Sequence, residues 1–488
     1  PEHRVMVVMP AMLSDPAAIA GLAHRLQLHH LANPEVHAQF ALLTDWGDAD
    51  EAHTPRDEPL LAQATELVAA LNARHTQAGD DPASPRFLLL HRRRRYSSSE
   101  RRWIGWERKR GKLEQLVAVL AAAPSPDTPT RPPFVHLGAL STPAAGTRYI
   151  LTLDSDTQLP PGRLRELVGV AAHPSNRPRL ALGSGARSSR VVAGYGILQP
   201  RLVTPLPLPR EDTFFHRMFA GQCGIDPYSA ASSEVYQDLF AEGSFTGKGL
   251  LHVQAMHAVL GGSLPEDQVL SHDLLEGALA RCAAVTDVTL IEDAPFHAEV
   301  AASRVHRWTR GDWQLLPILL RSLVQPWRYP LGAVNRWKIV DNLRRSLVSP
   351  VSLVLLVLAL AGLPDVPPLG WTLALVAAAF AAGPLMGALA GTVASSRTVA
   401  LLHFYRAAAL DLLRALAGGL WHLAMLLPQA GNAVDAIVRA LYRTVFSRRL
   451  MLQWTTAATA QAAARGDLRF ALRRHWGVPL SALLLAAG

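Results

Sequence analysis

The sequence predicts an α/β domain followed by α-helices that span a membrane or lie along it. Up to about residue 345, short apolar runs alternate with helical patterns, which is typical of a largely parallel sheet. Beyond residue 346 come two long uncharged segments and an arginine-rich tail. The chain has 488 residues and is 49% hydrophobic but only 18% charged, and the uncharged segments explain this imbalance.

Four apolar runs in the first part predict buried strands, at residues 4–9, 40–44, 87–90 and 149–153. The first strand is expected to end at Pro10, because proline cannot donate a backbone hydrogen bond. Helical patterns between the runs predict helices at 15–31, 58–74 and 112–122. Loops are expected at 76–85 and at 123–147.

The second part predicts membrane helices. Residues 347–363 and 369–391 carry no charge and are joined by a turn, so we expect a transmembrane hairpin at 347–391; a buried core hairpin is the alternative. An interfacial helix is expected just before it, at 331–346. The domain at 1–330 and residues 392–475 are expected on the cytoplasmic side of the inner membrane, because the latter segment holds eleven arginines and three aspartates.

The tail predicts further membrane contact. Residues Val434, Ile437, Val438, Leu441 and Val445 follow helical spacing, which indicates a basic amphipathic helix at the membrane interface; an ordinary surface helix is the alternative. Residues 476–488 are expected to begin another, truncated transmembrane helix. Because the chain begins with proline, we expect it to be a piece of a longer protein.

Charge and cysteine content narrow the functional classes. The formal net charge of +9 favours anionic partners such as phosphates or acidic lipid. The two cysteines exclude a disulfide-framed secreted scaffold and fit a reducing compartment. Only four of the 48 basic residues are lysines. Most of the excess positive charge lies in the tail, which leaves the α/β part close to neutral.

Two acidic clusters follow predicted strands, where ligands bind in open α/β sheets. Asp45 begins the first, after the strand at 40–44, and Asp154 and Asp156 form an Asp-x-Asp in the second, after 149–153. Carboxylates that project together from a strand end repel each other unless a cation balances them. The clusters therefore favour a Mg²⁺ or Mn²⁺ ion that holds a diphosphate, and a turn or helix cap is the alternative.

A third acidic site is Asp273, at the head of a helical pattern. It is either a general base that deprotonates a hydroxyl or an ordinary helix-capping acid. The pair His272-Asp273 also matches a short signature of metal phosphohydrolases, on the evidence of two residues only.

Cations and aromatic rings alternate at 304–313, including Arg304, Arg307 and Trp308. Such a stretch binds diphosphate and stacks on sugars, or else anchors an interfacial helix. A similar stretch at 92–112 would by composition suit nucleic acid. The glycine-rich loop 242–249, with Glu242 and Lys248, is either a wall of a sugar site or a plain turn, and lacks the spacing of a Walker loop.

The order of these motifs resembles the processive, membrane-embedded glycosyltransferases of GT-A type, such as cellulose and hyaluronan synthases. Individual stretches are similar to the glycosyltransferase region of cyclic β-1,2-glucan synthases, namely WIGWERKRGKL (103–113), LTLDSDTQLP (151–160), GYGILQP (194–200), GIDPY (224–228), VYQDLFAEGSFTGKG (235–249), LSHDLLEG (270–277), HRWTRGDWQLL (306–316) and SRRLMLQW (447–454). The resemblance covers essentially the whole chain. It implies a Rossmann-like GT-A domain that uses UDP-glucose.

The resemblance also implies roles for single residues. Donor binding falls to Asp45, Lys112, Asp154 and Arg307, metal binding to Asp154 and Asp156, the general base to Asp273, and acceptor binding to Trp308, Glu242 and Lys248. Three positions depart from the pattern of the relatives. Ser-His-Asp stands where the related synthases have Thr-Glu-Asp, Arg304 stands where a box of the form Gln-x-x-Arg-Trp has glutamine, and Glu234 stands where aspartate is expected.

The expected reaction is transfer of glucose from UDP-glucose to the 2-hydroxyl of a growing β-1,2-glucan, with inversion. A synthase of another β-linked polysaccharide on the same fold is one alternative, and a non-catalytic, membrane-anchored nucleotide-sugar binding protein is another. The expected partners are UDP-glucose, the glucan chain, membrane lipid and further domains of a longer synthase. Nucleic acid is not expected, because a basic binding surface does not require acidic strand ends.

Overall fold

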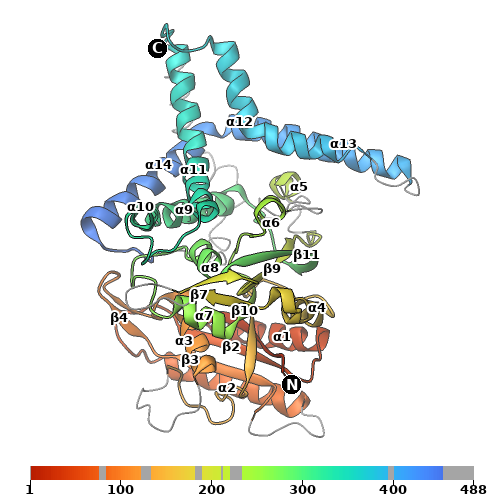
Figure 1. Cartoon of the computed structure of the whole chain (residues 1–488), viewed down its shortest axis with the longest axis vertical. Coiled ribbons are helices and arrows are strands. Elements are labelled where there is room, and N and C mark those ends of the chain that lie inside the picture. The colour runs from red at the N-terminus through yellow and green to blue at the C-terminus, as the bar shows by residue number, and fades with distance from the viewer. Residues whose placement is uncertain are drawn as a thin grey trace.

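The computed structural model describes residues 2–75, 84–122, 133–181, 189–209, 213–219, 234–393 and 400–453. Its α/β part lies at the bottom of Figure 1, and two long helices project from the top as a hairpin. The predicted loops at 76–85 and 123–147 lie partly outside the described residues, and so does the arginine-rich tail. The predicted helix at 476–488 and the stretch at 224–228 lie wholly outside them.

Seven strands form one sheet in the order β11-β9-β10-β6-β1-β2-β3. All neighbours are parallel except β10, which runs antiparallel to β6 and to β9. The four strands predicted from apolar runs are confirmed, as is the largely parallel sheet; β9, β10 and β11 were not predicted. The strands are β1 (Arg4–Leu13), β2 (Ala38–Trp46), β3 (Phe87–Arg92), β6 (Thr147–Thr152), β9 (Ile197–Val203), β10 (Gly249–His252) and β11 (Cys282–Ile291).

The prediction that the first strand ends at Pro10 is wrong, because β1 continues to Leu13. The carbonyl of Val8 accepts a hydrogen bond from Leu153, so Val8, and Pro10 two residues later, direct their backbone groups toward β6. The strand β6 has ended at that level, at Thr152. The missing N–H of Pro10 therefore breaks no ladder hydrogen bond, and β1 pairs with β2 to its end.

Helices cover both faces of the sheet. Val5 and Val7 of β1 pack in a core with α1 (Pro16–Ala32), α2 (Asp57–His75) and α4 (Arg163–Ala172). Met6 and Val8 face the opposite core, with α3 (Arg108–Ala121), α7 (Val253–Leu260) and α8 (Asp273–Ala280). This alternation explains why the strand is apolar without a break, since both of its faces are buried.

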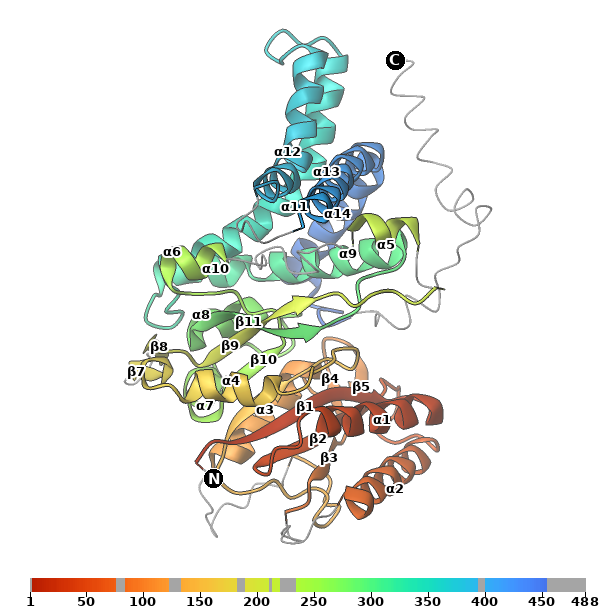
Figure 2. The same cartoon turned by 90° about the vertical axis from the view of Figure 1, so that its right-hand side faces the viewer.

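Shorter elements complete the α/β part. They are the pairs β4 (Arg95–Ser97) with β5 (Arg102–Ile104) and β7 (Arg179–Ala181) with β8 (Arg190–Ala193), a 3₁₀ turn (Pro174–Asn176), and the short helices α5 (Phe214–Phe219) and α6 (Val235–Phe240). The helices α9 (Ala298–Gln314) and α10 (Leu316–Val324) lie between the sheet and the hairpin (Figure 2).

The hairpin consists of α11 (Ala333–Leu360) and α12 (Leu369–Ala390), and both are long and apolar enough to cross a membrane. The sequence predicted a boundary at residue 346 between an interfacial helix and the first membrane span. The structure has no break there, because α11 is continuous through this position. The polar first half of α11 instead docks on the α/β part, where Asn335, Lys338 and Asp341 are buried.

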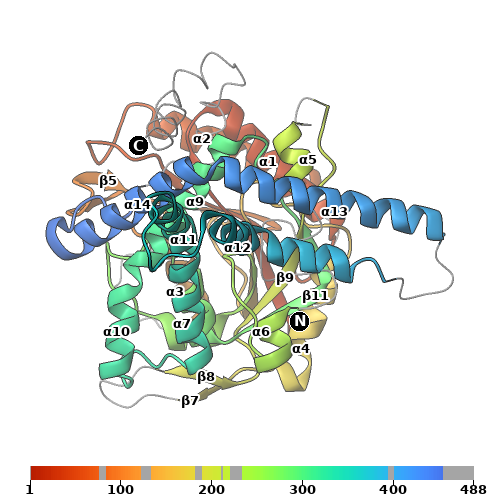
Figure 3. The same ribbon diagram turned by 90° about the horizontal axis from the view of Figure 1, so that it is seen from above.

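Figure 3 shows α13 (Leu401–Ala424) and α14 (Leu426–Tyr442) stretched across the top of the α/β part. A π-helical turn (Arg443–Ser447) follows α14. The two helices meet at a bend of 68°, and by length and composition they would make a third span only if the bent pair counted as one.

The predicted amphipathic helix corresponds to α14. Its small residues, including Ala433, Ala436 and Ala440, are buried, and the helix packs against α9 and α11. Of the predicted apolar stripe, Ile437 is buried, whereas Val434 and Val438 are exposed. One side of α14 thus packs on protein. Contact of its exposed valines with lipid stays a prediction.

Candidate active site at the carboxyl edge of the sheet

The sheet topology brings three chain segments together at one edge. Asp154 and Asp156 follow the carboxyl end of β6, and Glu292 follows that of β11, which runs in the same direction. Because β10 runs the opposite way, its first residue lies at this edge, and Lys248 immediately precedes it. A pair of backbone hydrogen bonds between Gln158 and Ile291 ties the loop after β6 to the end of β11.

Three carboxylates gather there. Ligand oxygens of Asp154, Asp156 and Glu292 all lie within 4.8 Å of one another. An all-oxygen set of this kind suits Mg²⁺ or Mn²⁺, which bind through a few carboxylates together with phosphate oxygens. These residues therefore fit the divalent metal implied by the sequence. Glu292 was not predicted, although it has the signal used for Asp154, an acid directly after an apolar strand.

Two lysines pair with Asp154. The ammonium of Lys109 lies 2.5 Å from Oδ1 and that of Lys248 lies 3.2 Å from Oδ2, while Lys248 also approaches Glu292 Oε2 at 2.7 Å. Burial would raise the pKa of the Asp154 carboxyl, but the two ammonium groups hold it well below its usual range. Burial would likewise lower the pKa of Lys248, but the surrounding carboxylates raise it. The shifts of Asp154 and Lys248 both favour the charged form, whereas burial raises the pKa of Glu292 against the effect of Lys248.

Asp45 lies in a separate, buried ion-pair cluster. Arg92 of β3 donates to both of its oxygens, at 2.7 and 2.9 Å, and the Lys112 ammonium lies 3.2 Å from Oδ2. Burial would raise the pKa of Asp45, but Lys112 and Arg92 hold it below its usual range. A Cβ on Gly105 would come within 2.1 Å of the carboxylate, so only glycine fits beside it.

The start of α3 connects the two clusters. Lys109 and Lys112 lie one helical turn apart, and they reach Asp154 and Asp45 respectively. The sequence predicted the pair of Asp45 and Lys112 as donor-binding, and the structure brings these two together. The Asp45 side chain is only 4% exposed, whereas that of Asp154 is 34% exposed. Direct contact of Asp45 with a nucleotide therefore stays a prediction.

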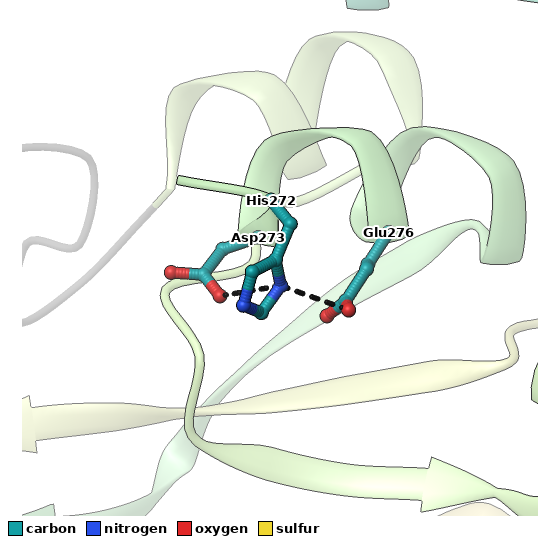
Figure 4. A group of neighbouring side chains, drawn as sticks. All are labelled: His272, Asp273 and Glu276. Carbon is teal, nitrogen blue, oxygen red and sulfur yellow. Dashed lines mark ion pairs between the residues drawn. The ribbon is translucent and has the colours of Figure 1, made fainter. Parts of the chain in front are cut away.

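Asp273 begins α8 beside a histidine and a second acid (Figure 4). His272 Nδ1 lies 2.8 Å from Glu276 Oε1 and 3.5 Å from Asp273 Oδ1. Burial would lower the pKa of His272, but Glu276 and Asp273 raise it. Burial also raises the pKa of Asp273, although the charge of the neighbouring His272 acts to lower it. The three groups are close enough together to bind a metal ion. Their proximity is equally explained without a metal, because a protonated His272 lying between the carboxylates of Asp273 and Glu276 forms an ion pair with them.

Asp273 faces the same space as the Asp-x-Asp cluster. Both of its oxygens lie 3.0 Å from the point where a Cβ on Gly247 would stand, and Lys109 donates a hydrogen bond to the Gly247 carbonyl at 2.8 Å. Gly247 has a φ of +85°, which a side chain would also disfavour. The Asp273 side chain is 33% exposed, so one carboxylate beside the Asp154 cluster is accessible to a ligand.

The Arg/Trp stretch lies on α9. Burial lowers the pKa of Arg307, then Arg304 lowers it further, while Asp154, Asp273 and Asp156 oppose the shift. Arg307 is thus within electrostatic reach of both acidic groups, as the diphosphate-binding role requires. Trp308 is 40% exposed, and the Arg304 guanidinium lies 5.8 Å from its ring centroid.

The glycine-rich loop contacts the first membrane helix. Asn335 of α11 donates to Glu242 Oε2 at 3.0 Å, and Arg281 lies 3.4 Å from Oε1. Lys338 of α11 donates to the carbonyls of Glu242 and Gly243, at 3.0 and 2.8 Å. Of the two predicted acceptor residues in this loop, Lys248 lies in the carboxylate cluster, and Glu242 contacts α11 and Arg281.

A segment after α14 returns to the α/β part. Arg108 donates to the Leu452 carbonyl, Leu452 N–H donates to Glu100, and Gln314 of α9 donates to the Met451 carbonyl. Met451 and Leu452 are buried. This segment therefore links the start of α3, which carries Lys109, to α9, which carries Arg307.

Comparison with known proteins gives one clear relative. The chain aligns over 486 residues, 100% of its length, with the cyclic beta-(1,2)-glucan synthase NdvB of Rhizobium meliloti (strain 1021), at 41% identity. The chain spans only 16% of that protein. No protein-family model matches the chain.

Proposed function

The chain is related over its whole length to one segment of a cyclic β-(1,2)-glucan synthase, and we propose that it is the glycosyltransferase part of such an enzyme. The proposed reaction transfers glucose from UDP-glucose to the 2-hydroxyl of a growing β-1,2-glucan, with inversion at the anomeric carbon. We assign residues 1–330 to a GT-A-type domain. Because the relative is much longer than this chain, further domains complete the proposed synthase.

The observation that carries the proposal is the presence of two acidic groups with different surroundings at one edge of the sheet. Asp154 is paired with two ammonium groups, and its pKa is lowered. Asp273 is partly exposed, and its pKa is raised. Carboxylates whose environments drive their pKa values apart are typical of an ion-binding acid beside a general base.

The donor site is proposed around Asp154. A Mg²⁺ or Mn²⁺ ion held by Asp154, Asp156 and Glu292 would neutralise charge on the diphosphate. Arg307 is proposed to bind the diphosphate oxygens, since a guanidinium forms paired hydrogen bonds with them. The buried cluster of Asp45, Arg92 and Lys112 holds the start of α3 in place. We propose that the uridine of the donor binds near this cluster.

Asp273 is proposed as the general base. Its carboxylate accepts the proton of the acceptor hydroxyl while that oxygen bonds to the anomeric carbon and the bond from this carbon to UDP breaks. The base must be ionised to act, so activity falls as the pH drops through the pKa of Asp273. Trp308 offers an exposed ring for stacking on the acceptor sugar. Acceptor contacts are also proposed for Glu242 and Lys248, in the glycine-rich loop.

The membrane arrangement follows from the two apolar helices. We propose that α11 and α12 anchor the enzyme in the inner membrane, with the α/β part and α14 on the cytoplasmic side. The docking of the polar half of α11 on the glycine-rich loop supports an active site held close to the bilayer surface.

The test is product analysis. Membranes that carry the full-length protein are incubated with radiolabelled UDP-glucose, and in parallel with other UDP-sugars, and the linkage of the labelled polymer is determined. The proposal predicts 2-linked glucose from UDP-glucose. Polymer from another donor or with another linkage would assign the enzyme to a different β-glycan, and binding without any polymer would indicate a non-catalytic protein.

A further inference from the structure

We propose that Lys248 is an internal placeholder cation, which occupies the metal position until the metal and the nucleotide diphosphate enter together. This inference rests on the proposed function, because it concerns the same donor site. It assigns to Lys248 a positioning role in donor binding, in addition to the acceptor contact expected from the sequence.

The ammonium group of Lys248 lies among the carboxylates that would bind the metal. Lys248 Nζ lies 3.2 Å from Asp154 Oδ2 and 2.7 Å from Glu292 Oε2, and these are two of the three carboxylates that would bind the metal. A divalent ion bound to the same oxygens would lie about 2.0–2.2 Å from each. The ammonium group and the ion would therefore compete for the same oxygens, and two like charges at this separation repel each other.

The balance of charge in the site changes when a metal ion binds. Counted as fully ionised, Asp154, Asp156 and Glu292 contribute three negative charges, and Lys109 and Lys248 contribute two positive charges. A divalent ion that arrives alone changes the formal charge of this group from −1 to +1, whereas an ion that arrives with a diphosphate brings the compensating negative charge. The lysines thus disfavour the free metal and favour the metal–nucleotide complex.

The backbone around Lys248 is held in place by two flanking glycines. The residue stands between Gly247, at a φ of +85°, and Gly249. Gly249 is fixed as the first residue of β10, where a Cβ would come within 2.4 Å of the Leu198 carbonyl oxygen. Because β10 is held in this way, we infer that the ammonium of Lys248 moves from the carboxylates to a phosphate oxygen by rotation of the side chain alone.

The test measures Mn²⁺ binding by the electron paramagnetic resonance signal of free Mn²⁺, with the full-length synthase in detergent, with and without UDP. In the wild-type protein we expect weak binding of Mn²⁺ alone and at least tenfold tighter binding with UDP. In Lys248→Met, we expect Mn²⁺ alone to bind at least tenfold more tightly than in wild type, and the effect of UDP to shrink.

Two variants control for the loss of a lysine. Lys248→Arg keeps a cation beside Asp154 and should bind free Mn²⁺ as weakly as wild type. Lys338→Met removes another buried lysine, whose ammonium donates to two backbone carbonyls, and should leave Mn²⁺ affinity unchanged. The coupling between UDP and Mn²⁺ in the wild type needs no variant, and its absence refutes the inference even if Lys248→Met does not fold.

The outcomes separate this inference from the proposed function. If the wild type binds Mn²⁺ tightly with UDP but Lys248→Met binds free Mn²⁺ no more tightly, the placeholder role is refuted and the donor site stands. Equal Mn²⁺ affinity with and without UDP in the wild type also refutes it. If the wild type binds Mn²⁺ neither alone nor with UDP, the metal site of the proposed function fails with it.

Discussion

Replacing Arg92 by methionine tests the buried cluster that supports the start of α3. The guanidinium donates five hydrogen bonds: two to the Asp45 carboxylate, one to Gln115, and one each to the carbonyls of Trp106 and Arg108. Its side chain is 3% exposed, so water cannot replace these partners. Breaking a buried ion pair costs about 3–5 kcal/mol. Because Lys112 remains 3.2 Å from Asp45, we expect the lower end, about 3 kcal/mol.

Hydrogen exchange measured by mass spectrometry detects the loss of stability in individual strands. A loss of about 3 kcal/mol predicts exchange roughly a hundredfold faster for the amides of β2 and β3, which Asp45 and Arg92 join. Amides of β9 and β11, at the other end of the sheet, serve as the internal reference. The Arg92→Lys variant keeps the positive charge but not the forked guanidinium. Its exchange rates in β2 and β3 should therefore lie between those of the wild type and of Arg92→Met.

The pH dependence of the same experiment has a fixed sign. The pKa of Asp45 is lowered in the folded protein, so its ion pairs stabilise the fold above the unfolded pKa of about 3.9 and this stability is lost as the pH falls further. The difference between wild type and Arg92→Met should therefore shrink at acidic pH. Unchanged exchange of β2 and β3 at neutral pH would refute the view that Arg92 holds Asp45.

Three further predictions concern the same edge of the sheet. Gly105→Ala should displace the Asp45 carboxylate and weaken UDP binding, as measured by calorimetry, whereas Gly21→Ala, where a Cβ meets no atom within 4 Å, should not. Glu276→Gln should lower the pKa of His272 in a nuclear magnetic resonance titration, because Glu276 is the main group that raises it. The raised pKa means that protonated His272 stabilises the fold. This stabilisation is complete below the unfolded-state pKa of about 6.5 and is lost as the pH rises through the folded-state pKa. Asp156→Ala should abolish the difference in UDP affinity between chelator-treated and Mg²⁺-supplied protein, and a persistent difference would remove Asp156 from the metal site.

The sequence predicted the positions of chemistry better than their partners. Asp45 and Asp154 were found because each is an acid after an apolar strand. The partners Arg92 and Lys109 were missed, because which strand ends are neighbours depends on the sheet order and not on any single stretch of sequence. Glu292 has the same signal as Asp154 but was missed because β11 was not recognised as a strand.

The reversed strand β10 is the clearest example of this limit. Lys248 reaches the carboxyl edge only because β10 runs against its neighbours, and β10 is short and was not recognised as a strand. In the same way, the polar half of α11 looked like a separate interfacial helix, since its docking partners in the glycine-rich loop are about a hundred residues away in sequence. Tertiary contacts, rather than local propensity, decide both features.

The most direct test of the proposed mechanism is glucose transfer by the Asp273→Asn variant. Asparagine keeps the size of the side chain but cannot accept the acceptor's proton. The account predicts that this variant binds UDP with nearly wild-type affinity and incorporates almost no radiolabelled glucose from UDP-glucose into polymer. Incorporation at the wild-type rate would contradict the assignment of Asp273 as the base, and with it the proposed active site.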